Sequence, residues 1–299
     1  MNSSIATTVF LPIALAVIMF GLGLSLTVAD FTRVVRYPKA SLIALGCQIL
    51  VLPAICLGLV LLFDLDPPLA VGMMLLAAAP GGTTANLFSH LAHGDVALNI
   101  TLTAVNSVLA VITLPIVVNL SLQGFMEGEE AIGLQPDKLL QVFAIVLIPV
   151  AIGMLVRRRT PGFADRLNRP VRIASIVVLV SVIAVAVFQE RGNVMDYIES
   201  VGLLALIFCV VSLTIGYTVP RALRVPRGQA IASSFEVGIH NSTLAITIAL
   251  SPALLDSAEM AIPAAVYGIA MFIPAGILAY LLNRRREPAS EKVPDRSRP

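Results

Sequence analysis

The stretch with the clearest chemistry runs from Phe235 to Asn241 and reads Phe-Glu-Val-Gly-Ile-His-Asn. Glu236 lies in the eighth of nine apolar segments and is the only acidic residue away from the ends of any of them. A carboxylate in hydrocarbon needs a counter-ion, a proton or a cavity that holds water. Gly238 and the polar pair after it predict that the helix is interrupted here. We interpret Glu236 as the ligand of a coupling cation in a membrane transporter.

Side chains with oxygen atoms that suit a hard cation occur elsewhere in the chain. Asn99, Thr103 and Asn106 are spaced i, i+4 and i+7, so they form one polar stripe on an otherwise apolar helix. A cation such as Na⁺ binds several such oxygens, completed by backbone carbonyls. Asn86, Asn99, Thr103 and Glu236 all offer oxygen atoms of this kind. Interhelical hydrogen bonding is the alternative explanation of the stripe.

Two further polar residues, Gln48 and His240, each have two possible explanations, and a third, Asp95, has a simpler one. Gln48 is a strong polar group among apolar neighbours, either a ligand or a link between helices. His240 lies four residues after Glu236, and an imidazole, with an unperturbed pKa of about 6.5, can carry a proton. A neutral histidine that is hydrogen-bonded within the core is the alternative. Asp95 is expected to cap the helix that begins after Gly94.

Apolar segments long enough to span a bilayer must position these residues. The chain has 299 residues, is 58% hydrophobic and 13% charged, and has a mean hydropathy of +0.92, which predicts an all-α polytopic membrane protein. The net charge of +2 is too small to indicate a nucleic-acid partner. The expected spans are about 5–28, 40–63, 68–93, 95–122, 137–156, 171–189, 198–220, 228–251 and 259–283.

The loops between these nine transmembrane helices alternate in charge. With the first basic loop placed in the cytoplasm, 18 of the 20 basic residues fall on one side and two on the other. This distribution follows the positive-inside rule and predicts an outside N-terminus, a cytoplasmic C-terminus and, in a bacterial cell, the inner membrane. The polar tail, residues 284–299, is expected to be disordered.

Two of the helices are predicted to be broken. The third contains Pro80-Gly81-Gly82, where proline removes a backbone donor and the glycines lower the cost of unwinding. The eighth contains the break near Gly238. The two breaks lie five spans apart, so the helices run in opposite directions, as in inverted-repeat transporters. Half-helices that begin near Thr83 and Asn241 favour an anion, and those that end near Ala79 and Val237 favour a cation.

The stretches 80–86 (Pro-Gly-Gly-Thr-Thr-Ala-Asn), Gly94-Asp95 and 236–241 (Glu-Val-Gly-Ile-His-Asn) resemble the bile acid:sodium symporter family, and the similarity runs over nearly all of residues 5–283. The resemblance implies a panel domain and a core domain in which the two broken helices cross, moving by alternating access. It implies a first sodium site at Asn86, Asn99, Thr103 and Glu236, and a second at Gln48, Glu236 and the carbonyls of Val237, Ile239 and His240.

The chain departs from the family pattern at Ala85 and His240. Ala85 stands where the family often has a serine ligand, and His240 stands where it has a glutamine, whose oxygen an imidazole lacks. Our hypothesis is that transport is coupled to one Na⁺, or to Na⁺ and H⁺, with His240 as a proton site. We expect Na⁺ to be the only metal, with no transition metal and no organic cofactor.

The chain is expected to form one transporter domain over residues 1–299. The panel is assigned to helices in about 5–63 and 137–189, and the core to helices in about 68–122 and 198–283. The expected partners are a small organic anion, Na⁺ and the lipid bilayer. Thr83, Thr84 and Asn241 are the predicted contacts of the anion. The sequence leaves the oligomeric state open and is compatible with a monomer.

The expected function is sodium-driven import of a bile-acid-like, pantoate-like or keto-acid anion. A proton-coupled carrier of organic anions and a cation/proton antiporter of the same architecture are the nearest alternatives. An intramembrane enzyme with Glu236 and His240 as acid and base is a further alternative, but no nucleophile motif or metal-ligand set accompanies these two residues in the sequence.

Overall fold

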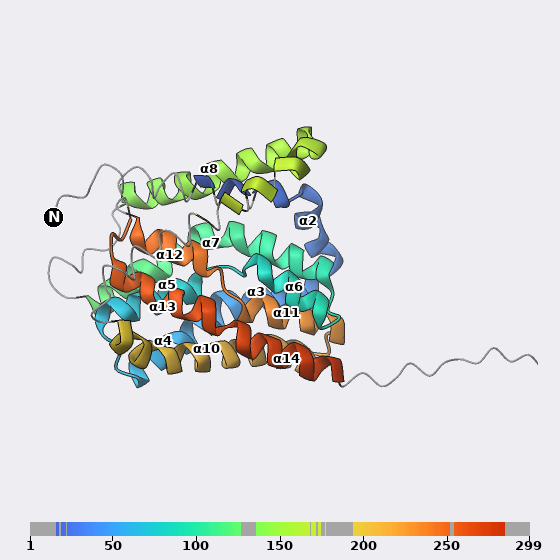
Figure 1. Cartoon of the computed structure of the whole chain (residues 1–299). Coiled ribbons are helices and arrows are strands. Elements are labelled where there is room, and N and C mark those ends of the chain that lie inside the picture. Colours follow the sequence, from blue (N-terminus) through green and yellow to red (C-terminus); the bar gives the residue numbers. More distant parts are fainter. Residues whose placement is uncertain are drawn as a thin grey trace, which may run out of the picture.

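The computed structural model describes residues 16–17, 19–21, 23–126, 136–167, 169–171, 173–174, 177, 194–251 and 254–284. Within these residues the regular structure is helical, apart from one isolated β-bridge (Figure 1). Four of the described helices are long and apolar enough to cross a membrane: Pro38–Leu62, Val96–Phe125, Glu199–Ala222 and Ala258–Arg284. The chain is therefore an all-α membrane protein, as predicted.

The N-terminal half of the described chain is a run of helices broken at prolines and glycines. Proline occupies the first helical positions of α3 and α5, where its missing N–H has no helical partner to lose. The elements are α2 (Val28–Thr32), a 3₁₀ turn (Arg33–Arg36), α3 (Pro38–Gly46), a π-helical turn (Cys47–Val51), α4 (Leu52–Leu62), α5 (Pro67–Ala78), α6 (Thr83–Leu91) and α7 (Val96–Phe125).

The predicted cap of α7 is confirmed. The backbone N–H of Leu98 donates to the carboxylate of Asp95 at 3.0 Å. The remaining elements are α8 (Pro136–Arg159), α10 (Val194–Ala222), α11 (Arg227–Gly238), α12 (Ser242–Leu250), α13 (Ala258–Ala270) and α14 (Phe272–Arg284). The expected span 171–189 and the tail after residue 284 lie largely outside the described residues, so the count of nine spans stays a prediction.

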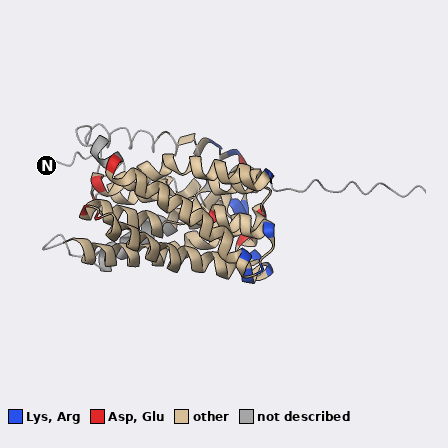
Figure 2. Ribbon diagram, turned by 90° about the horizontal axis from the view of Figure 1, so that it is seen from below, with Lys and Arg blue, Asp and Glu red and all other residues tan. Residues whose placement is uncertain are grey.

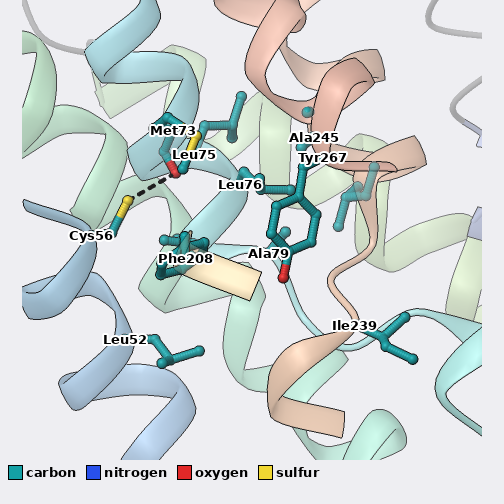
Figure 3. Close-up of a cluster of buried hydrophobic side chains, with 14 of the residues drawn as sticks. Leu52, Cys56, Met73, Leu75, Leu76, Ala79, Phe208, Ile239, Ala245 and Tyr267 are labelled. Carbon is teal, nitrogen blue, oxygen red and sulfur yellow. Dashed lines mark hydrogen bonds between the residues drawn. The ribbon is translucent and has the colours of Figure 1, made fainter. Parts of the chain in front are cut away.

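The short helices pack into one bundle around α5 and α11. The contacts of α5 are with α4, α7, α12 and α13, and those of α11 are with α3, α6, α7 and α10. The helices α2 and α8 lie along one side of this bundle, where both contact α7 (Figure 1). Apolar side chains of α4, α5, α10 and α13 fill the middle, among them Leu52, Met73, Leu76, Phe208 and Tyr267 (Figure 3).

Charged residues separate to the two ends of the bundle. Lys and Arg gather at one end, whereas the other end carries Asp and Glu without a comparable group of basic residues (Figure 2). We call the first the basic end; α3 and α11 begin there, beside Lys39 and Arg227, and α14 ends there at Arg284. The guanidinium of Arg227 donates to the carbonyl of Leu282 at 2.6 Å, which ties the start of α11 to the end of α14.

Candidate functional site

The two predicted helix breaks are both present. One helix stops at Ala78 and resumes as α6 at Thr83, and the other stops at Gly238 and resumes as α12 at Ser242. The interruptions occur where proline and glycine make a regular helix costly. Each break leaves carbonyls of one half-helix and N–H groups of the next without helical partners.

The two breaks cross and satisfy each other. The N–H of Gly82 donates to the carbonyl of Ile239 at 2.7 Å, and the N–H of Asn241 donates to the carbonyl of Pro80 at 2.8 Å. Gly81 and His240 thereby form an isolated antiparallel bridge. Unwound backbone inside a membrane is tolerated only where such groups are paired or face a cavity. We call the residues 79–82 and 238–241 the crossing.

Glu236 lies at the crossing, 2% exposed. Its Oε2 accepts a hydrogen bond from the hydroxyl of Thr103 at 2.5 Å. The carboxyl group packs against Gly81, where even a methyl group would overlap it. The acidic side chain of one broken helix therefore packs against the glycine of the other, and Thr103 of α7 donates a hydrogen bond to it.

The residues of the first predicted site lie on three helices, α6, α7 and α11, that pack against one another. Asn99 donates its Nδ2 to the carbonyl of Ala232 at 2.7 Å, one turn before Glu236. Among the described residues, Asn86 Oδ1, Asn99 Oδ1 and Glu236 Oε1 are buried oxygens that accept no hydrogen bond. Buried oxygens normally have a partner. Unpaired oxygens on three helices that pack against one another, one of them from a carboxylate, suit a hard monovalent cation.

The polar side chains of the second predicted site also meet, and they turn nitrogen toward the carbonyl of Ala79. Gln48 lies in the π-helical turn, and its Nε2 donates to the carbonyl of Ala79 at 3.0 Å. The same Nε2 lies 3.4 Å from Nδ1 of His240, which is itself 3.3 Å from the Ala79 carbonyl oxygen. The carbonyl of Ile239 already accepts from Gly82. The end of α5 is thus occupied by protein donors.

His240 is enclosed by aromatic rings. Its imidazole stacks on Phe208 with ring centroids 5.4 Å apart and meets Tyr267 edge to face at the same centroid distance. The Tyr267 hydroxyl donates to the carbonyl of Gly238 at 2.8 Å. The sequence reasoning missed Tyr267; the signal that could have found it is a tyrosine within an apolar span, because a buried tyrosine usually hydrogen-bonds.

The predicted substrate contacts lie at the two half-helix N-termini. Asn241 uses its Oδ1 to cap α12, accepting from the N–H of Leu244 at 3.0 Å. At α6 the N-cap is Gly82, which provides no side-chain acceptor. Thr84 is half-buried, and the side chain of Thr83 lies outside the described residues. Of these two helix N-termini, that of α6 therefore lacks a side-chain acceptor from its own N-cap residue, whereas that of α12 has one.

Comparisons with known proteins agree with these features. The sequence model described as the Sodium Bile acid symporter family matches residues 12–197. The "Uncharacterized sodium-dependent transporter YocS" of Bacillus subtilis is 28% identical over 92% of this chain and 84% of that protein. The ileal sodium/bile acid cotransporter of Homo sapiens is 24% identical over 82% of this chain and 70% of that protein. "Probable sodium/metabolite cotransporter BASS2, chloroplastic" of Oryza sativa is 26% identical over 94% of this chain and 65% of that protein. The chain belongs to the sodium bile acid symporter family and is thus a membrane transporter rather than an enzyme.

Proposed function

We propose that this transporter imports a small organic anion by symport with sodium. The observation that carries the proposal is the set of unpaired buried oxygens on Asn86, Asn99 and Glu236, which lie on three helices that pack against one another. The sodium dependence stated in the names of the relatives supports the choice of ion. Glu236 supplies the negative charge, and the side chains of Asn86, Asn99 and Thr103 supply neutral oxygens.

The proposed coupling is one Na⁺, or one Na⁺ with a proton at His240. The amide nitrogen of Gln48 and the Nδ1 atom of His240, two residues of the second predicted sodium site, both approach the carbonyl of Ala79. Nitrogen donors at a carbonyl compete with a metal ion for the same oxygen. Val237, Ile239 and His240 contribute backbone to this side of the crossing, where the carbonyls of Ile239 and His240 already accept from Gly82 and Ser242.

The anion is proposed to bind at the N-terminus of α6, near Thr83, Thr84 and Asn241. Free N–H groups and the helix dipole attract negative charge at such an end. The Na⁺ bound by Glu236 would lie beside the adjoining helix α11, so the charges of Na⁺ and of the organic anion would compensate each other. The classes to test are a bile-acid-like anion, a pantoate-like anion and a keto acid.

We propose that alternating access moves a panel against a core. The division proposed from sequence is about 5–63 and 137–189 for the panel, and about 68–122 and 198–283 for the core. The packing of α3 and α4 against α5, α10 and α11 favours placing residues 38–62 with the core. The proposed location is the inner membrane, with the N-terminus outside and the basic end in the cytoplasm.

Uptake into proteoliposomes tests the function. Taurocholate, pantoate and pyruvate are offered with an inward Na⁺ gradient, an equal K⁺ gradient or a proton gradient alone. We expect Na⁺-stimulated uptake of one of them, abolished in Glu236→Gln and retained in Glu259→Gln, a carboxylate at the start of α13. Uptake driven equally by protons alone would refute sodium coupling. Sodium-driven proton movement without any organic anion would identify an antiporter instead.

A thermal-shift measurement separates binding from transport. A ligand at 100 times its Kd stabilises the folded protein by about 2.7 kcal/mol. Na⁺ should therefore raise the unfolding temperature of the wild type and of Glu259→Gln, but not that of Glu236→Gln. An equal sodium shift in Glu236→Gln would show that the site lies elsewhere.

A further inference from the structure

A cavity of about 140 Å³ lies at the basic end, where three helix ends meet. Helix α6 ends there at Leu91, α11 begins at Arg227, and α14 ends at Arg284. Of these helices, α6 packs against both α11 and α14 (Figure 1). These residues are distinct from those assigned to sodium and to the organic anion. The cavity is lined by Ala92, His93, Arg227, Gly228, Ile231 and Leu282.

The two helices that end at the cavity have side-chain donors for carbonyls of their last turn. Nδ2 of Asn283 donates to the carbonyl of Leu91 in α6 at 2.9 Å. The guanidinium of Arg227 donates to the carbonyl of Leu282 in α14 at 2.6 Å. Protein groups therefore already face the negative ends of both helix dipoles.

The helix that begins at the cavity receives no acceptor from its cap residue. The N-cap of α11 is Pro226, whose side chain has no hydrogen-bonding atom. The first N–H groups of a helix have no partner within that helix. Gly228 is the second residue of α11, and within 4 Å a methyl group there would meet only the backbone nitrogen of Asp95, at 3.8 Å. The positive end of α11 therefore adjoins open space in the cavity.

The carboxylate of Asp95 serves a different helix. The backbone N–H of Asp95 donates to the carbonyl of Gly228 at 2.8 Å, which ties the start of α7 to the start of α11. Its side chain accepts from the N–H of Leu98 and caps α7. The cavity wall itself carries the positive charge of Arg227 and the ring of His93, which can donate an N–H in either tautomer. This combination attracts an anion.

A buried hydroxyl adjoins the same cavity. Ser89 is 0% exposed, and its Oγ has no hydrogen-bond partner among the described residues. The position that a methyl group on Gly94 would take lies 2.6 Å from Oγ of Ser89 and 2.8 Å from Cγ2 of Ile231. Since Ile231 lines the cavity, an unpaired donor lies close behind its wall.

We propose that this cavity binds a phosphate group. A phosphate presents oxygens in several directions, as the donors of α11 and of the turn after α6 require, whereas a carboxylate presents two in one plane. The guanidinium fork and the N–H groups of a helix start both suit phosphate oxygens. Basic pockets between transmembrane helices bind the phosphates of lipid headgroups, and a free phosphate offers the same chemistry.

The site goes beyond the proposed function and does not depend on sodium coupling. A bound phosphate would supply the acceptor that Pro226 cannot give to α11, the helix that carries Glu236. It assigns a role to Arg227 and Gly228, which the sodium and anion sites leave unused.

Thermal-shift titrations of the purified protein in a neutral detergent test the site. Na⁺ is held constant and no organic anion is added. The probes are inorganic phosphate, compared with chloride at equal ionic strength, and dioleoylphosphatidylglycerol, compared with dioleoylglycerol, which lacks the phosphate. We expect at least one probe to raise the unfolding temperature beyond its control. A response to phosphatidylglycerol alone identifies a lipid source, and one to inorganic phosphate alone a free phosphate. No response to either probe would overturn the proposal.

Arg227→Gln should weaken the response to the active probe at least about tenfold in concentration, because a hydrogen bond from a charged group contributes about 1.5–3 kcal/mol. Arg224→Gln is the matched control, since it removes the same charge three residues earlier, at an exposed position. It should respond as the wild type does. Equal weakening in the two variants would show a general effect of surface charge and contradict the site.

Gly228→Glu keeps the proposal testable if Arg227→Gln fails to fold. Glutamate is favourable in the first turn of a helix, and the space beside Gly228 is open, so this variant should fold and place its own carboxylate in the cavity. We expect it to lose the response to the active probe, whereas Gly228→Ala should keep it. Equal responses of Gly228→Glu and Gly228→Ala would show that phosphate binds elsewhere.

Discussion

The carboxyl group of Glu236 lies against Gly81, so the acidic residue of one broken helix rests on the glycine of the other. The contact joins residues from opposite halves of the chain at the antiparallel bridge between Gly81 and His240. A side chain at position 81 would displace the carboxylate. The glycine is therefore needed for space as well as for unwinding.

Gly81→Ala should weaken sodium binding. The added methyl group overlaps the carboxyl group of Glu236, and overpacking of this kind costs about 1–3 kcal/mol, or roughly tenfold or more in affinity. Sodium titrations followed by thermal shift measure the effect. Gly58→Ala is the control, because nothing lies within 4 Å of a methyl group there. Unchanged sodium affinity in Gly81→Ala would place the ion away from this carboxylate.

Thr103→Val should reduce sodium affinity about 10- to 100-fold, whereas Thr103→Ser should keep it. The Thr103 hydroxyl is 2.5 Å from Oε2 of Glu236, and a hydrogen bond to a charged group contributes about 1.5–3 kcal/mol. Valine preserves the shape and removes the oxygen. Sodium dependence of uptake and of thermal stability are compared for the two variants. If both behave alike, the hydroxyl has no part in the site.

His240→Gln should change the sodium dependence of uptake from a Hill coefficient of about one toward two. Glutamine supplies an amide oxygen beside the carbonyl of Ala79, where the wild-type ring presents nitrogen. His93→Gln, in the turn after α6, is the control and should leave the coefficient unchanged. Two Na⁺ per substrate in the wild type at every pH would contradict the proposed coupling.

Tyr267→Phe should destabilise the protein by about 1–3 kcal/mol. It removes the hydroxyl that donates to the carbonyl of Gly238 at 2.8 Å and leaves the buried end of α11 underpaired. Tyr280→Phe serves as the control, because Tyr280 is 59% exposed. Chemical or thermal unfolding in detergent measures the difference. Equal stability of the two variants would show that this hydrogen bond contributes little.

Asp95→Ala should cost about 1 kcal/mol of stability through loss of the cap on α7. Asp66→Ala tests the specificity of this effect, since Asp66 precedes α5 without a side-chain cap bond. Unfolding of both variants is compared with the wild type. A larger loss in Asp66→Ala than in Asp95→Ala would contradict the assignment of the cap.

The local features of this protein could be predicted from its sequence. Proline and glycine predicted both breaks, and Asp95 was identified as a cap. The spacing of Asn99, Thr103 and Asn106 predicted a polar stripe on α7, and all three residues are buried. Each depends on backbone preferences or helical periodicity over a few residues, and these act before any distant contact forms. The charge alternation along the loops likewise agrees with the charge separation in Figure 2.

The contacts at the crossing were decided by the tertiary structure. The packing of separate helices determines three contacts: Glu236 with Gly81, Gln48 with His240, and Tyr267 with Gly238. Sequence identified Gln48 and His240 as polar residues in apolar spans. Only packing showed that Gln48 turns its nitrogen toward the end of α5 and leaves its oxygen without a hydrogen-bond partner among the described residues. Side-chain direction at such distances follows from the shape of the assembled core rather than from local spacing.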